Sequence, residues 1–223
     1  MSGQQQLSEK AKGISLRFLV IAAIFLLALI LFGFIADEMV LENENHLDQV
    51  VFDQLRQITN PGITSVMLVV TFFGSSYFLL PAYTVLIAFY LFVKKDRKLS
   101  WDVAAVGITS TMILFSLKAI FKRHRPLDPL VQKVNGFSFP SGHSFSSFTF
   151  FGLLIFIIWN QQMNPVLRWI LTGFFFLFAC TIAFSRVYLH VHFASDVIAG
   201  VCLCVVWLGL SFWSLKKIDK SRV

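Results

Sequence analysis

Apolar residues fill six long stretches of the chain, separated by shorter polar segments. Roughly 20 consecutive apolar residues cross a bilayer as a helix, and several of these stretches approach or exceed that length. We therefore predict an all-α bundle of six transmembrane helices that forms one domain, residues 1–223. The predicted spans are residues 16–35, 63–93, 101–121, 144–159, 168–184 and 192–215.

The composition agrees with an integral membrane protein. Hydrophobic residues make up 57% of the chain and charged residues only 14%, which is more apolar than a soluble domain of this length requires. The first stretch also has one feature of a secretory signal peptide, because basic residues precede it. A signal peptide would have a shorter apolar core and a small-residue cleavage site before Asp37, so we predict an uncleaved first helix.

The segment between the first two spans, residues 37–61, is acidic but carries apolar residues at helical spacing. This pattern predicts a short amphipathic helix at the membrane surface. Such a helix either shapes the entrance to a site or simply connects two spans. The apolar stripe consists of Leu47, Val50, Val51, Leu55 and Ile58.

The formal net charge of +7 raises the question of nucleic-acid binding. The basic residues instead gather at the N-terminus, in the turn 94–98 and at the C-terminus, which is a membrane topology pattern. We therefore expect no nucleic-acid partner, and no obligatory protein partner is indicated. An even number of spans puts both termini on one side, and the positive-inside rule makes that side the cytoplasm. The basic loop 122–133 falls on the outer side, which indicates another role for its charges.

Three polar clusters interrupt the apolar pattern: residues 118–126, 140–144 and 185–196. Ionisable side chains at membrane depth cost roughly 2.5–3.5 kcal/mol each and usually mark a functional site. Counting the predicted crossings places all three clusters at the outer boundary of the membrane. They can therefore converge on a single site.

Positive groups in these clusters suit a phosphate. Lys118 and Arg125 are seven residues apart and share a face if the helix continues between them, and Arg186 adds a third charge. Arginine matches phosphate oxygens with a planar fork, and lysine adds a point charge. Residues 140–143 begin a helix whose free N–H groups and dipole favour an anion, and Gly142 allows the ligand to approach closely.

Two histidines and an aspartate provide the reactive groups. His192 and Asp196 are four residues apart, which places them on one face if the chain is helical there. A carboxylate beside an imidazole holds one ring nitrogen and leaves the other free to react. One histidine can attack phosphorus while the second, His143, protonates the leaving oxygen. The clusters therefore predict displacement at a phosphoryl group, which depends on positioning and charge stabilisation.

Taken together, three motifs resemble the signature of the type-2 phosphatidic acid phosphatases. These are integral membrane lipid phosphatases, related to glucose-6-phosphatases and vanadium haloperoxidases. The three motifs occur in order with the expected spacings, and the six-span layout extends the resemblance over most of the chain. They are Lys118-x6-Arg125-Pro126, Pro140-Ser141-Gly142-His143 and Ser185-Arg186-x5-His192-x3-Asp196.

The resemblance implies a role for each matching residue. His192 is expected to be the nucleophile that forms a phosphohistidine, Asp196 its orienting carboxylate and His143 the acid for the leaving group. The family generally needs no metal, and the sequence has no carboxylate cluster suited to magnesium, so neither a metal nor another cofactor is expected. The residues expected to bind phosphate are Lys118, Arg125, Ser141, Gly142 and Arg186.

Three residues stand apart from the family pattern. His190 occupies a position where a small residue such as glycine is common, and His124 fills a variable position. A metal pair made by His190 and His192 is an alternative, but we expect His190 to contact a headgroup or to be hydrogen-bonded. Arg123 is expected either to contact a second phosphate or a headgroup, or to anchor the chain at the interface.

The sequence as a whole favours a bacterial lipid phosphatase in the cytoplasmic membrane, with both termini in the cytoplasm and the active site facing the outer side. The expected partners are membrane lipids and a lipid phosphate substrate. Undecaprenyl pyrophosphate and phosphatidylglycerophosphate are the substrates that the resemblance implies. The alternatives are a lipid A phosphatase, a phosphotransferase, and a non-catalytic phospholipid binder or transporter.

Overall fold

Helices form almost all of the described chain. The computed structural model describes residues 3–41, 46–132 and 135–220, and no strand occurs among them. In chain order the elements are α1 (Gly3–Phe34), the π-helix η1 (Ile35–Leu41), α2 (His46–Ile58), α3 (Pro61–Phe72), α4 (Ser76–Ala88), the π-helix η2 (Phe89–Val93), α5 (Arg97–Phe121), α6 (Gly142–Trp159), α7 (Pro165–Tyr188) and α8 (Ala194–Lys220).

Six helical segments of the described chain are long and apolar enough to cross a membrane. This confirms the prediction of an all-α, six-span protein. The observed helices extend beyond the predicted spans: the third begins at Arg97 and the fifth runs from Pro165 to Tyr188. The longer fifth helix keeps Arg186 within its last turn.

Local sequence explains where several helices begin. Asn60 and Asn164 each precede a proline at the first helical position, and their side-chain oxygens accept hydrogen bonds from Ile63 N at 2.9 Å and Val166 N at 2.8 Å. Asparagine as N-cap satisfies a free amide of the first turn. Proline after it has the required backbone angle and no N–H to leave unpaired.

The second predicted span is interrupted between α3 and α4. Gly74 lies at the break, where an added Cβ would meet Ile182 Cγ2 at 2.5 Å and His143 Cδ2 at 3.1 Å. Only glycine fits such a close approach without moving its neighbours. The break therefore packs directly against α7 and against the first turn of α6, which carries His143.

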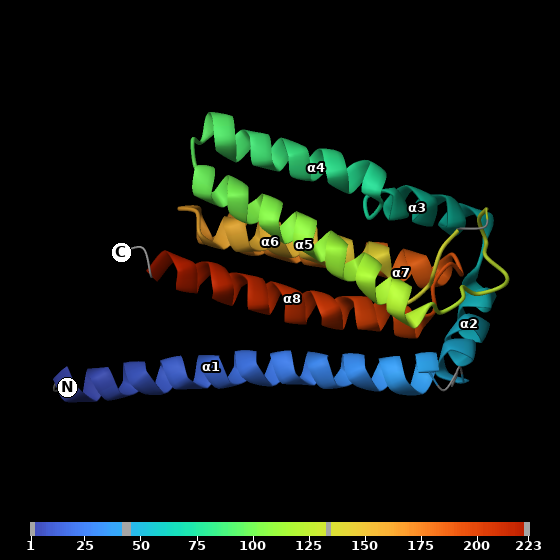
Figure 1. Ribbon diagram of the computed structural model, residues 1–223, viewed down its shortest axis with the longest axis horizontal. Helices are drawn as coiled ribbons and strands as arrows, with labels where there is room; N and C mark the ends of the chain where they lie inside the picture. Colours follow the sequence, from blue (N-terminus) through green and yellow to red (C-terminus); the bar gives the residue numbers. More distant parts are fainter. Residues whose placement is uncertain (1–2, 42–45, 133–134, 221–223) are drawn as a thin grey trace.

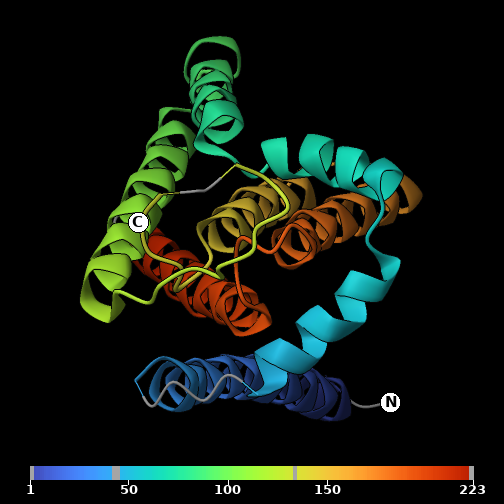
Figure 2. The same cartoon turned by 90° about the vertical axis from the view of Figure 1, so that its right-hand side faces the viewer.

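Helix α2 confirms the predicted amphipathic helix, but its buried face differs from the predicted stripe. Leu55 is buried, whereas Leu47 and Ile58 are 61% and 52% exposed. Asp48, which we did not single out, is only 1% exposed. Helix α2 crosses one end of the bundle between α1 and α3 (Figure 2).

Helices α6, α7 and α8 form the centre of the bundle, with α6 packed against both of the others. Helix α1 packs on α8, α3 on α7, and α4 on α5. The two termini lie at one end, and the loops that precede α6 and α8 lie at the other, which is also the end that carries α2 (Figure 1). The three polar clusters of the sequence all map to this loop end.

Candidate active site

The starts of α6 and α8 meet at the loop end of the bundle. Ser141 N donates a hydrogen bond to Asp196 O at 3.0 Å. Gly200 makes this contact possible, because a Cβ there would lie 2.9 Å from Ser141 O. The second and third polar clusters are thus joined, as the count of crossings predicted.

His192 lies in the turn before α8 and is 1% exposed. Its Nδ1 is 3.4 Å from Asp196 Oδ2, and its Nε2 is 3.0 Å from Arg125 Nη1. Because a guanidinium only donates hydrogen bonds, Nε2 must be the unprotonated nitrogen and Nδ1 carries the proton toward Asp196. Burial lowers the pKa of His192 to about 3, against the opposing effect of Asp196. A neutral imidazole whose Nε2 carries no proton is what a nucleophile requires.

Asp196 is fully buried, and several groups fix its carboxylate. Its Oδ2 accepts hydrogen bonds from Phe193 N at 3.0 Å and from the Ser138 hydroxyl. Since α8 begins at Ala194, His192 precedes the helix. The condition that the chain is helical at His192 is therefore not met, although the two side chains do pair. The turn at the start of α8 brings them together.

Three cations, Lys118, Arg125 and Arg186, belong to the same cluster of interacting charges as Asp196. Lys118 Nζ donates to Phe137 O at 2.7 Å and to Ser138 O at 3.2 Å. Arg125 Nη1 donates to Val191 O at 2.7 Å, and Arg186 Nη1 donates to Thr71 Oγ1 at 2.6 Å. Among the described residues, the buried Arg186 Nε has no hydrogen-bond partner. A buried donor of this kind favours an anionic ligand.

Arg125 does not lie on the helix that carries Lys118. Helix α5 ends at Phe121, and Lys122 adopts a left-handed backbone conformation with φ of 50°. The condition under which Lys118 and Arg125 would share a helix face is therefore not met. The following loop delivers Arg125 instead, held by its Nε bond to Gly136 O at 3.0 Å.

The start of α6 provides backbone N–H groups at the same site. Ser141 is the N-cap, and its Oγ accepts from Ser144 N at 3.4 Å. The cap leaves the amides of Gly142 and His143 in the first turn without an intrahelical acceptor. A Cβ on Gly142 would lie 3.8 Å from Lys118 Cε. Pro140 lies outside the helix, before the N-cap, and not inside its first turn as expected.

His143 lies in the first turn of α6 and is half-buried. Its imidazole interacts electrostatically with Arg186, His192, Arg125 and Lys118. Both histidines therefore belong to one cluster, with the cations between and around them. The structure brings together every residue that the three motifs assigned to catalysis or phosphate binding.

Arg123 and His190 lie beside this cluster. Arg123 is 7% exposed and bonds to Asp196 Oδ1 at 2.7 Å and Asp48 Oδ2 at 3.0 Å. This placement differs from the expected headgroup or interfacial contact. His190 is 4% exposed and packs on Phe52 with ring centroids 4.7 Å apart. Within the described residues, no group of three metal-ligating side chains is found.

Three polar residues that contact the site were missed from the sequence: Ser138 on Asp196, Thr71 on Arg186 and Asp48 on Arg123. No motif marks them, because Ser138 sits in a loop and Thr71 inside an apolar span. The sequence around Asp48 gave a weak indication that this residue is special. It is a carboxylate that falls between the apolar residues of a predicted amphipathic helix.

The fold and the site together define a multi-pass membrane protein with a buried His–Asp pair, a second histidine and a set of cations suited to phosphate. Comparison with known proteins gives the family. The PAP2 superfamily model matches residues 98–220. The chain is 31% identical over 172 residues to phosphatidylglycerophosphatase B of Bacillus subtilis, covering 74% of this chain and 79% of that protein. The chain belongs to the PAP2 superfamily.

Two further similarities agree with this assignment. The crystal structure of the transmembrane PAP2-type phosphatidylglycerolphosphate phosphatase from Bacillus subtilis superposes with a TM-score of 0.73. It is 28% identical and matches 90% of this chain and 96% of its own. Dolichyldiphosphatase 1 of Dictyostelium discoideum is 31% identical over 104 residues, which cover 43% of this chain and 45% of that protein.

Proposed function

We propose that this protein is a lipid phosphatase that removes the terminal phosphate of a membrane lipid phosphate through a phosphohistidine at His192. The observation that carries the proposal is the state of that imidazole. Its Nδ1 faces Asp196 Oδ2 and its Nε2 lone pair faces Arg125 Nη1 at 3.0 Å. A nucleophilic nitrogen that points at a phosphate-binding cation fits in-line attack on phosphorus.

The reaction runs in two displacements. His143 enters the cycle as the imidazolium. His192 Nε2 attacks phosphorus, the bond from phosphorus to the leaving oxygen breaks, and His143 gives that oxygen a proton and becomes neutral. Asp196 stabilises the positive charge that develops on the His192 ring. His143 then takes a proton from water, whose oxygen attacks phosphorus. The P–N bond breaks, and inorganic phosphate leaves with His192 neutral again.

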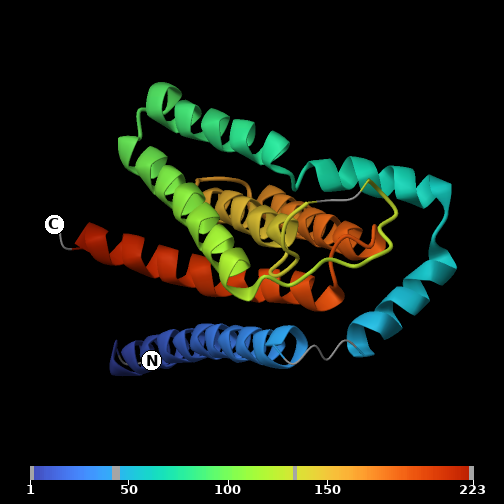
Figure 3. The ribbon, with the colours of Figure 1, turned by 45° about the vertical axis from the view of Figure 1, so that its right-hand side comes forward.

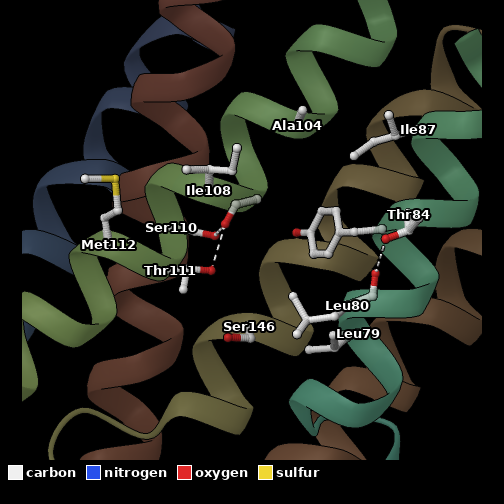
Figure 4. Close-up of a pocket in the computed structure, with 12 residues that line it drawn as sticks. Leu79, Leu80, Thr84, Ile87, Ala104, Ile108, Ser110, Thr111, Met112 and Ser146 are labelled. Atoms are coloured by element: carbon white, nitrogen blue, oxygen red, sulfur yellow. Dashed lines mark hydrogen bonds between the residues drawn. The ribbon is translucent and has the colours of Figure 1, made fainter.

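A cavity of about 400 Å³ between α4 and α5 supports a lipid substrate (Figure 4). Its lining is largely apolar and includes Leu79, Leu80 and Ile108. Ser146 of α6 also lines it and follows His143 by one helical turn. A lipid tail in this cavity would enter between helices from the membrane and bring its phosphate to the start of α6.

The substrates we propose are undecaprenyl pyrophosphate and phosphatidylglycerophosphate. The names of two relatives support them, since one acts on phosphatidylglycerophosphate and the other on a dolichyl diphosphate. Dolichyl and undecaprenyl diphosphates are both long-chain polyprenyl diphosphates. Lipid A and transfer of the phosphate to a lipid alcohol are retained as alternatives for the same site chemistry.

Phosphate release from a panel of lipid phosphates in detergent tests the activity and the substrate. We expect turnover of polyprenyl diphosphate or phosphatidylglycerophosphate to persist in excess EDTA, because the described site supplies its positive charge from side chains and backbone N–H groups. Brief reaction with phosphate-labelled substrate should leave acid-labile, alkali-stable label on the peptide containing His192. Loss of all activity in EDTA, restored by a divalent ion, would contradict this mechanism.

We propose that the loop end of the bundle faces the outer side of the cytoplasmic membrane. Asn135 is exposed at that end, and Gln161 is exposed in the turn between α6 and α7 at the other. In a background with the three native cysteines replaced by alanine, Asn135→Cys should react with an impermeant thiol reagent in intact cells. Gln161→Cys should react only after lysis. The reverse pattern would invert the orientation.

A further inference from the structure

A chain of buried charges continues from Asp196 away from His192. While Asp196 Oδ2 faces the imidazole, Asp196 Oδ1 accepts a 2.7 Å hydrogen bond from Arg123 Nη1. Arg123 Nη2 donates to Asp48 Oδ2 at 3.0 Å. The guanidinium also lies over the Phe193 ring, 4.1 Å from its centroid. Arg123 therefore bridges two carboxylates, and all three side chains are at most 5% exposed.

Asp48 joins this series of buried charges from α2, which is far from Arg123 and Asp196 in the sequence. Its Oδ1 accepts from Ser195 N at 2.9 Å and its Oδ2 from Ser195 Oγ at 2.6 Å. Ser195 N belongs to the first turn of α8, so Asp48 satisfies a helix N-terminus that α8 does not satisfy by itself. Helix α2, which lies across the loop end (Figure 3), is thus fixed to the turn that carries His192 and Asp196.

The charges of these three residues sum to one negative charge. If Asp196 and Arg123 formed a buried pair without Asp48, the arginine would neutralise the carboxylate on which the His192 imidazole depends. Asp48 supplies the counter-charge to Arg123. Asp196 then keeps its negative charge for the ring that becomes cationic during phosphoryl transfer, while Arg123 still holds its orientation.

We infer that Asp48 and Arg123 are positioning residues for phosphoryl transfer, with Asp48 balancing Arg123 so that Asp196 remains a full negative charge beside His192. Helix α2 is accordingly a part of the catalytic assembly and not a connector. This inference rests on the proposed role of His192 as nucleophile. In this role both residues act through Asp196.

Kinetics of charge variants test the inference. Asp48→Asn and Arg123→Gln should each lower kcat by about 10- to 100-fold, the usual effect of losing a group that orients a ligand. KM for the lipid should stay within about twofold, because neither side chain binds substrate. The decisive variant combines both changes. It restores the net charge of the network, so its kcat should exceed that of Asp48→Asn by roughly threefold or more.

Two control variants on α2 separate charge from docking. Asp53→Asn removes an exposed carboxylate that pairs with exposed Arg56 at 3.2 Å, and its kcat should match wild type. Leu55→Ala removes a buried contact with Val187 and Leu189. It should lower the melting temperature and leave kcat within about twofold of wild type.

Three outcomes would overturn the inference. They are an unchanged kcat in Asp48→Asn, a double variant worse than either single variant, and a kcat loss in Leu55→Ala equal to that in Asp48→Asn. If Asp48→Asn does not fold, Arg123→Gln alone is compared with the double variant on the same terms. Failure of the proposed function would give a different result. His192→Ala would then keep its turnover, irrespective of the effect of the Asp48 variants.

Discussion

His192→Ala should lose essentially all lipid phosphatase activity, with kcat lowered by about a millionfold, as when a nucleophile is removed from a catalytic unit that acts together. The reason is the geometry at Nε2. This nitrogen, which we propose as the nucleophile, is unprotonated and faces Arg125, and its ring is held at the other nitrogen by Asp196. The measurement is inorganic phosphate release from detergent-solubilised substrate, together with labelled phosphate retained on the protein.

His46→Ala is the matched control, since His46 is an exposed histidine at the start of α2. It should retain wild-type turnover. Vanadate, a phosphate mimic, should still bind His192→Ala weakly through the cations and the α6 amides. Turnover in His192→Ala equal to wild type would show that another group attacks phosphorus.

The same variant should change how stability depends on pH. The folded protein keeps His192 neutral because burial lowers its pKa to about 3, whereas an unfolded histidine titrates near 6.5. Between these values the unfolded state binds a proton that the folded state does not, so stability falls as pH drops from about 6.5 toward 3. This contribution disappears in His192→Ala. Its melting temperature in detergent should therefore decrease less on acidification than that of wild type.

The fold was predictable because the membrane leaves the backbone few choices. Unpaired peptide groups are too costly in lipid, so long apolar stretches become helices whose number and order can be counted. The bounds were less accurate. Helix α5 already begins at Arg97, and α7 continues to Tyr188. Polar residues at the membrane boundary interrupt the apolar pattern there, so the pattern does not locate the ends of these helices. The break at Gly74 depends on Ile182 and His143 and cannot be recognised locally.

The reactive residues were predictable for a related reason. Charged and imidazole side chains are rare in apolar surroundings, so His143, His192 and Asp196 stood out, and counting crossings placed them at one end. The local structure that brings these residues into contact differs from the one expected. Arg125 reaches the site from a loop, and His192 pairs with Asp196 through a turn before α8.

Supporting residues could not be recognised from local sequence. Ser138 contacts Asp196 across 58 positions, Arg186 contacts Thr71 across 115, and Asp48 contacts Ser195 across 147. Serine, threonine and aspartate at these places look like ordinary loop, span and surface residues. The packing of α2 and α3 over α7 and α8, together with the path of the loop before α6, gives them their roles.

Asp196→Asn should reduce kcat by about 10⁴-fold, the size of effect seen when the carboxylate of a catalytic triad becomes an amide. An amide has a single acceptor oxygen. It cannot accept from Arg123 at one position and from Phe193 N, the Ser138 hydroxyl and the His192 ring at the other. An N–H group facing Nδ1 would favour the His192 tautomer whose proton sits on Nε2, which removes the attacking lone pair.

Rapid mixing with labelled substrate measures this effect, because formation of the labelled protein should slow by the same factor as turnover. Asp53→Asn, which makes the same chemical change at an exposed site of α2, should behave as wild type. A merely structural role for Asp196 predicts something else: KM and kcat would deteriorate together with the melting temperature, and the fraction of protein still folded would label at the normal rate. Labelling at the normal rate would thus show that Asp196 has no part in the chemical step. This buried carboxylate can affect attack on phosphorus only through the orientation and charge of the His192 ring.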